Sequence, residues 1–127
     1  MSTREDAIRL IQSIYYDSID AGDMARAATA LHPDIDWSHA QVWAHHDFAR
    51  AEPSGFKGRQ AVRDFLAARV DQLREARITH GIEDMVFEND RGAFLGNVTG
   101  PDGTTKPFMV WFALTDGLVS RYDLRPL

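Results

Sequence analysis

The second half of this chain carries four segments in which apolar and polar residues alternate. They span residues 76–89, 91–100, 105–115 and 118–127, and the turns "END", "GPDG" and "TDG" separate them. A period of two is typical of strands with one buried face, and Asp-Gly between two such runs is a strong hairpin signal. This half of the chain therefore predicts four consecutive antiparallel strands.

Apolar residues in the first half recur at helical spacing instead. Residues 7–19 fit one helix that ends at Ala21 and Gly22, and Asp23 is suited to cap a short second helix that Pro33 would stop. We expect a strand at 34–38, an irregular segment at 40–58 with a helical turn near 43–48, and a third helix at 62–73. Helices followed by antiparallel strands predict an α+β domain whose sheet curls around the helices.

Composition excludes several classes of function. The 127 residues suit a single domain over 1–127, and a net charge of -5 without a basic stripe argues against nucleic-acid binding. No apolar run approaches the roughly 20 residues that span a membrane. The absence of cysteine excludes disulfides, and with an N-terminus unlike a signal peptide it favours a cytoplasmic setting. The histidines lack the spacing of a metal site, so we expect no metal and no cofactor.

Four motifs connect the chain to a known family. They are "YYDSIDAGD", "LHPDIDW", "GFKGRQAVRDFL" and "FALTDGLVSRYD", and in this order they cover nearly the whole chain. The chain resembles the SnoaL-like members of the nuclear transport factor 2-like superfamily, which include ketosteroid isomerases, polyketide cyclases, limonene epoxide hydrolases and scytalone dehydratases. The resemblance implies a cystatin-like curved antiparallel sheet wrapped around three N-terminal helices, a cone with a deep apolar pocket, and a homodimer.

The same resemblance implies candidate catalytic residues. Tyr15, eight residues before Asp23, matches the isomerase tyrosine that donates a hydrogen bond to the enolate oxygen. His39 ends "DWSH", where the isomerase has its aspartate base, and its ordinary pKa near 6.5 suits a base at neutral pH. Val110 takes the place of the isomerase's second, acidic donor. Asp123 resembles the acid/base aspartate of the polyketide cyclases, and it would orient His39 or act as a second acid/base.

The family's strand register, together with strand alternation, predicts the remaining wall of the pocket. Arg121, Asp123 and Arg125 would point inward from the last strand. Trp37 and an apolar wall would contact the substrate, and the members of that wall are Phe94, Val98, Val110 and Phe112. Gly96 would leave room for the ligand. Trp111 would face outward and suit a dimer contact, whereas Tyr16 and Asp17 would lie on the solvated side of the first helix.

These residues support a small cofactor-free enzyme that moves protons on an apolar, oxygenated substrate such as a polyketide, terpenoid or steroid-like carbonyl compound. Isomerisation, cyclisation and dehydration all use the same set of residues. Two other classes remain open, namely a non-catalytic protein that binds a small molecule in the pocket, and an interaction module that dimerises through the outer sheet face. An epoxide hydrolase matches less well, because Arg121 and Asp123 supply only part of its Asp-Arg-Asp arrangement.

Overall fold

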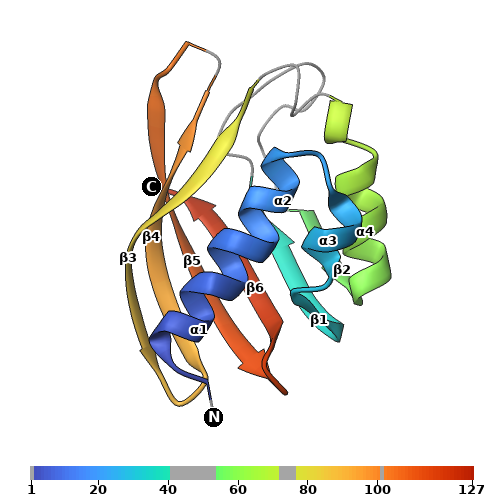
Figure 1. Ribbon diagram of the computed structural model, residues 1–127, viewed down its shortest axis with the longest axis vertical. Coiled ribbons are helices and arrows are strands. Elements are labelled where there is room, and N and C mark those ends of the chain that lie inside the picture. The colour runs from blue at the N-terminus through green and yellow to red at the C-terminus, as the bar shows by residue number, and fades with distance from the viewer. Residues whose placement is uncertain (1, 41–53, 72–76, 101) are drawn as a thin grey trace.

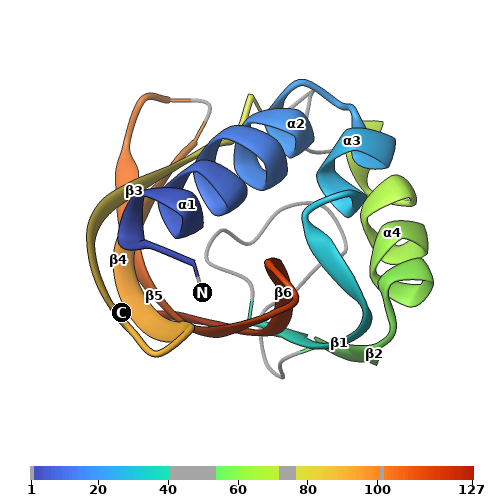
Figure 2. The ribbon, with the colours of Figure 1, turned by 60° about the horizontal axis from the view of Figure 1, so that its bottom comes forward.

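Helices pack against one face of a curved six-stranded sheet in the computed structural model, which describes residues 2–40, 54–71, 77–100 and 102–127 (Figure 1). The strand order is β2-β1-β6-β5-β4-β3. Only β1 and β6 run parallel, and the other neighbouring strands are antiparallel. The sheet curls around one side of the molecule while the helices cover the other (Figure 2). The predicted α+β cone is confirmed, with one parallel pair added.

The first helix is continuous but changes its winding along its length. It comprises α1 (Arg4–Ile8), η1 (Arg9–Tyr16) and α2 (Asp17–Asp20). The middle part is π-helical, and the Asp17 N–H donates to the carbonyl of Gln12, five residues earlier. Asp23 caps α3 (Met24–Ala28) as predicted, because its side chain accepts a hydrogen bond from the backbone N–H of Arg26 at 3.0 Å. The last helix described is α4 (Arg59–Ala67).

The six strands agree with most of the predicted segments. They are β1 (Leu31–His39), β2 (Ser54–Lys57), β3 (Thr79–Glu88), β4 (Arg91–Thr99), β5 (Thr105–Thr115) and β6 (Leu118–Pro126). Two predictions are wrong, namely that Pro33 stops the second helix and that residues 40–58 are irregular throughout. Pro33 lies within β1, where the pairing with β6 is irregular and tolerates a residue without an N–H, and β2 occupies part of the segment expected to be irregular. The helical turn expected at 43–48 lies outside the described residues.

A β-bulge in β6 decides which residues of the last strand face the helices. The register between β5 and β6 shifts between Ala113 and Leu114, so that Val119 and Tyr122, three residues apart, are both buried. An added residue reverses the alternation beyond it. Simple alternation from Val119 would turn Arg121, Asp123 and Arg125 inward, but they lie on the outer face. There the side chain of Asp123 accepts a hydrogen bond from Arg121 Nε at 2.8 Å.

Aromatic rings fill the interior over the middle of the sheet. Phe94 of β4 packs with its ring centroid 6.2 Å from that of Phe108 and 5.8 Å from that of Phe112, both on β5. All three are almost completely buried. Gly96 adds no space for a ligand, because the ring of Phe108 and the carbonyl of Gly81 already occupy the volume beside its Cα. Beside Gly96, described side chains and backbone therefore fill the space that was expected to hold a ligand.

Side chains of the first helix cover the exposed edge of β3. The Gln12 amide accepts a hydrogen bond from the Ile82 N–H at 2.8 Å and donates one to the His80 carbonyl at 3.1 Å. The carboxylate of Asp20 accepts a hydrogen bond from the backbone N–H of His80 at 2.9 Å. Arg4 Nε donates to the Met85 carbonyl at 2.9 Å. An edge strand has unpaired backbone groups on one side, and these bonds satisfy several of them. They also fix the backbone that carries His80.

Among the described helices, none is both long enough and apolar enough to cross a membrane.

Candidate active site

A small cavity lies between the end of the first helix, α4 and the strands β1 and β6. Its volume is about 40 Å³. This is room for a few waters, and it is well below the roughly 150 Å³ that holds benzene in an engineered cavity. The described residues of its wall are Tyr15, Tyr16, Ile19, Trp37, His39, Phe65, Leu66, Arg69, His80, Tyr122 and Leu124. The wall thus combines aromatic rings with phenols, two imidazoles and one guanidinium.

Tyr15 presents a neutral phenol to the cavity. Its hydroxyl accepts a hydrogen bond from Trp37 Nε1 at 3.0 Å, so the hydroxyl proton is left for another acceptor. Burial raises the pKa of Tyr15 above its ordinary value, although the Trp37 hydrogen bond opposes this rise. Tyr15 is therefore protonated at neutral pH and can donate a hydrogen bond. The structure places Tyr15 and Trp37 in one cavity, as the sequence predicts.

Tyr16 and Tyr122 form a second pair of phenols. Their hydroxyl oxygens lie 2.7 Å apart, and burial raises the pKa of each well above the usual value. Two hydroxyls need only one proton to bond to each other, so one further donor remains in the pair. The prediction that Tyr16 is solvated is wrong, because its side chain is 1% exposed. The wide π-helical turns reduce the angle between successive side chains, which lets Tyr15 and Tyr16 both face inward.

His80 and Asp20 form a histidine–carboxylate dyad at the cavity. The Nδ1 atom of His80 lies 2.7 Å from Asp20 Oδ1, while the other carboxylate oxygen holds the His80 backbone N–H. The Asp20 carboxylate can accept the Nδ1 proton of His80, and in that tautomer Nε2 is the acceptor nitrogen. The His80 ring stacks on Tyr16 with centroids 5.0 Å apart. The sequence offered no sign of this dyad, whose members are sixty residues apart.

His39 lies at the same cavity but in a different electrostatic environment. Its ring stacks on Trp37, with an angle of 3° between the planes and centroids 5.4 Å apart. Burial among the aromatic rings, and then repulsion by Arg69, by protonated His80 and by Arg125, lower the pKa of His39 to about 3. His39 is therefore neutral at physiological pH. Because a base works best when its pKa is near the working pH, this environment makes His39 a weak proton acceptor.

The other residues predicted to form the site lie elsewhere. Phe94, Val98, Val110 and Phe112 face inward as predicted, but they belong to the packed core and take no part in the described wall of the cavity. Arg121 and Asp123 are on the outer face of the sheet and do not reach this wall. The prediction that Asp123 orients His39 is therefore wrong, and the bulge in β6 is the reason. Tyr122, its neighbour in sequence, lines the cavity instead.

Arg69 was also missed, and it lies two residues beyond the end of α4. Its backbone N–H donates to the Leu66 carbonyl at 3.0 Å. Its guanidinium carbon lies 5.0 Å from the centre of the Phe65 ring. The residue is only 6% exposed.

No group of three or more histidine, aspartate or glutamate side chains suited to a metal occurs in the described part of the chain. The described wall of the cavity itself supplies hydrogen-bond donors and proton acceptors.

Comparisons with known proteins agree with this fold. Residues 14–122 match a family model described as a SnoaL-like domain. A candidate ketosteroid isomerase from Kribbella flavida is 19% identical with a TM-score of 0.69, and the match covers 97% of this chain and 78% of that one. A candidate polyketide cyclase from Sinorhizobium meliloti is 14% identical with a TM-score of 0.69, with 98% and 100% covered.

The structure of TerC co-crystallised with polyporic acid is 19% identical to this chain with a TM-score of 0.71, and the match covers 96% of this chain and 92% of TerC. None of the curated proteins compared with the chain matches it. At these identities the solved structures establish a shared fold.

Proposed function

This chain belongs to the SnoaL-like domain family, whose fold fits isomerase or cyclase activity, and on that premise we propose that it is a cofactor-free acid/base enzyme. The substrate is a carbonyl compound with a proton on the carbon next to the carbonyl group. His80 Nε2 accepts that proton, and a tyrosine hydroxyl binds the oxygen that gains negative charge. The observation that carries the proposal is the His80–Asp20 dyad at a cavity lined by neutral phenols.

Each member of the site has a role that its surroundings support. Asp20 holds His80 in the tautomer that leaves Nε2 as the acceptor, and its negative charge stabilises the imidazolium that forms. Tyr15 has a hydroxyl proton that the Trp37 bond leaves unused, so it donates to the developing enolate oxygen. His39 stays neutral and serves as a hydrogen-bonding group. Since proton abstraction begins isomerisation, aldol cyclisation and dehydration alike, the proposal covers all three.

The size of the cavity limits how a substrate binds. A volume of about 40 Å³ admits a carbonyl group and one or two neighbouring atoms. A polyketide or steroid-like substrate would therefore place its reacting end in the cavity and the rest of the molecule at its opening, or it would have to displace aromatic rings. A non-catalytic protein of the same fold would meet the same limit.

Deuterium exchange tests the proposal. A panel of small ketones and enones is incubated with the protein in deuterated water, and proton NMR follows the loss of signals next to the carbonyl group. We expect catalysed exchange with wild type and a decrease of about 100-fold or more with His80→Gln, the usual contribution of a general base. His32→Gln, at a histidine outside the cavity wall, serves as the matched control and should leave the rate unchanged. Panel members that bind without any exchange would contradict the enzyme and favour a protein that only binds.

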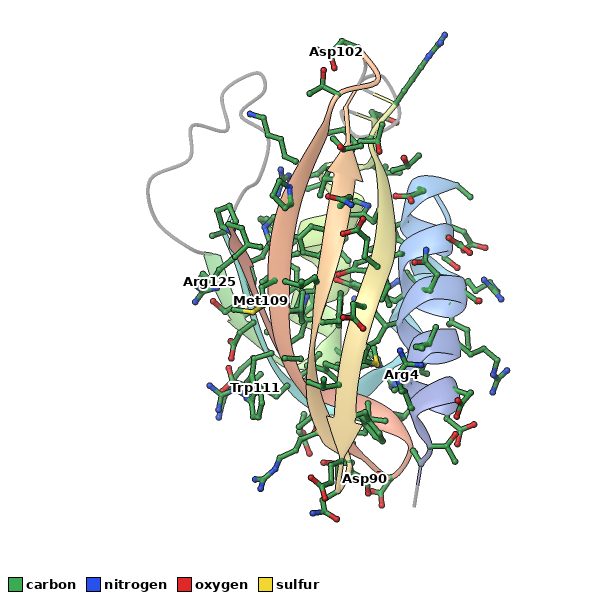
Figure 3. The ribbon with its side chains drawn as sticks, turned by 90° about the vertical axis from the view of Figure 1, so that its left-hand side faces the viewer. Arg4, Asp90, Asp102, Met109, Trp111 and Arg125 are labelled. Carbon is green, nitrogen blue, oxygen red and sulfur yellow. The ribbon has the colours of Figure 1, made fainter. Side chains whose placement is uncertain are left out.

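We also propose that the outer sheet face joins two copies of this chain. Met109 and Trp111 of β5 are each 44% exposed, and Leu95, directly across from Met109, is 40% exposed. Arg125 lies beside Met109 in the sheet, and the side chains of Met109, Trp111 and Arg125 project away from the first helix (Figure 3). Apolar groups beside charges of both signs suit an interface in which one patch meets its own copy across a two-fold axis.

Oligomeric state tests the dimer directly. Sedimentation equilibrium should give twice the mass of one chain, and Trp111→Glu should shift the equilibrium to monomers. Thr115→Glu, at an exposed position of the same strand, is the matched control and should stay dimeric. A wild-type protein that sediments as a monomer at high concentration would refute this interface.

A further inference from the structure

We propose that a groove between α3 and α4 binds a small phosphate ester. The two helices lie side by side, on the opposite side of the molecule from β3 (Figure 1). The volume of the groove is about 290 Å³, close to the roughly 300 Å³ at which small-molecule sites begin. None of its lining residues belongs to the cavity wall that contains His80, so this inference goes beyond the proposed function and does not depend on it. The described residues that line the groove are Ala25, Ala28, Thr29, Arg59, Gln60 and Arg63.

Positive charge is the first argument. Arg59 and Arg63 are one turn apart on α4, and residues four apart lie on the same face of a helix. Both line the groove, whereas none of its described lining residues carries a carboxylate. The ion pairs between residues that the structure describes involve neither arginine. Because the whole chain has a net charge of -5, this local positive charge does not come from a basic composition.

The cost of these positions to the helix is the second argument. Two like charges four residues apart repel each other and weaken a helix, and a positive charge in the first turn, where Arg59 lies, is also unfavourable. The adjacent pair at the same spacing is stabilising, since the Gln60 amide donates a hydrogen bond to Asp64 at 2.8 Å. An anion bound by both guanidiniums would offset the repulsion between them.

The shape of the groove is the third argument. Arg59 is half-buried, and its Nη1 atom donates to the Leu31 carbonyl at 3.4 Å, which holds the side chain beside the groove. That bond uses one of the five N–H donors of the guanidinium. On the side of α3 the lining consists of Ala25, Ala28 and Thr29, whose side chains are small. They leave space and apolar surface for the organic part of a ligand.

Charge matching selects the class of ligand. A phosphate ester carries close to two negative charges at neutral pH, and its three terminal oxygens are strong hydrogen-bond acceptors. Two guanidiniums match this charge, and each can pair with two oxygens at once. A carboxylate has a single charge and would compensate only one guanidinium. The groove therefore favours a phosphate monoester with a small organic group over a carboxylic acid of similar size.

NMR titration locates the site. Phenyl phosphate is added to the isotopically labelled full chain at slightly alkaline pH and low salt, and benzoate is the matched ligand with the same ring and one charge. We expect saturable shifts of the backbone amides of Ala28, Arg59 and Arg63. Phenyl phosphate should bind about tenfold more tightly than benzoate, because it makes additional charge-assisted hydrogen bonds. Added salt should weaken binding, since it screens exposed charges.

Variants assign the binding to the two arginines. Arg63→Gln should weaken the binding of phenyl phosphate about tenfold, and Arg59→Gln should do the same. Arg63→Lys should retain part of the affinity, because it keeps the charge and loses the planar fork. Arg91→Gln removes the same charge from an exposed position on β4, and it should bind as tightly as wild type. Arg63 is exposed, so its variants test the site even if Arg59→Gln unfolds through loss of the Leu31 bond.

Four results would overturn this inference. They are the absence of saturable binding of phenyl phosphate, an affinity that Arg63→Gln leaves unchanged, an equal loss of affinity with Arg91→Gln, and equal binding of benzoate and phenyl phosphate. The first three would remove the site, and the fourth would remove its preference for phosphate. The proposed function would stand in each case, because deuterium exchange depends on His80 and on the separate cavity.

Discussion

Protonation of His39 should reduce the stability of the fold as the pH falls. Burial among aromatic rings, and then repulsion by Arg69, by protonated His80 and by Arg125, lower the pKa of His39 from 6.5 to about 3. Unfolding releases the ring into water, where its pKa returns to the ordinary value. Between these two values the unfolded chain binds one proton more than the folded chain, so the contribution is complete above pH 6.5 and is lost as the pH falls toward 3.

The magnitude follows from the shift in the pKa of His39. Each pH unit below 6.5 costs about 1.4 kcal/mol for one proton. Lowering the pH from about 8 to about 5 crosses roughly 1.5 of these units, so the free energy of unfolding should fall by about 2 kcal/mol through His39 alone. Urea denaturation followed by tryptophan fluorescence measures this free energy at each pH.

A variant isolates this residue from the other titrating groups. His39→Gln removes the titration, so its stability should fall less than that of wild type by about 2 kcal/mol over the same pH range. His32→Gln, outside the described cavity wall, is the control for removing a histidine elsewhere in the fold. Parallel curves for wild type and His39→Gln would refute the argument that the environment of His39 disfavours its charged form.

Three further changes test individual contacts. The Asp20→Asn variant keeps one acceptor oxygen where Asp20 uses two toward His80. The free energy of unfolding measured in urea should therefore fall by about 1–3 kcal/mol, and the deuterium exchange rate should fall with it. Gln12→Ala removes two bonds to the edge of β3, and hydrogen exchange at the Ile82 amide should accelerate by about tenfold, whereas unchanged protection would contradict that anchoring role. Gly96→Ala would bring a methyl group to 2.8 Å from the Gly81 carbonyl oxygen, so thermal denaturation should show a loss of about 1–3 kcal/mol, and an unaffected melting temperature would show that the neighbours can move aside.

Local patterns in the sequence account for most of the fold. Alternation located the last four strands, and the Asp-Gly turns located the hairpins, because both depend on residues close in sequence. Asp23 was recognised as a cap for the same reason. The family resemblance implied how helices and sheet pack together. The parallel pairing of β1 with β6 was not predicted, since it joins segments about ninety residues apart.

The site was only partly predictable. The sequence motifs that suggested Tyr15, Trp37 and His39 lie within one stretch of the chain, and all three residues line the described cavity. The prediction that Asp123 points inward failed because one bulge residue reversed the inward and outward faces of β6. Such a register shift leaves no clear mark in the residue pattern. The prediction that Tyr16 is solvated failed because π-helical turns were not anticipated.

The most informative residues of the site were beyond the reach of local patterns. Asp20 and His80 come together only through the packing of the first helix on the edge of β3. Arg69 resembles any charged residue at a helix end until its burial beside Phe65 is seen. Chemistry that depends on tertiary neighbours has no signature in spacing alone.

The tautomer of His80 tests the central claim most directly. Long-range proton–nitrogen NMR spectra of the labelled protein at slightly alkaline pH report which ring nitrogen carries the proton. We predict a proton on Nδ1, held by Asp20, with Nε2 unprotonated and able to accept a proton from the substrate. Asp20→Asn should weaken that preference. A ring protonated on Nε2 in the wild-type protein would contradict the assignment of His80 as the base.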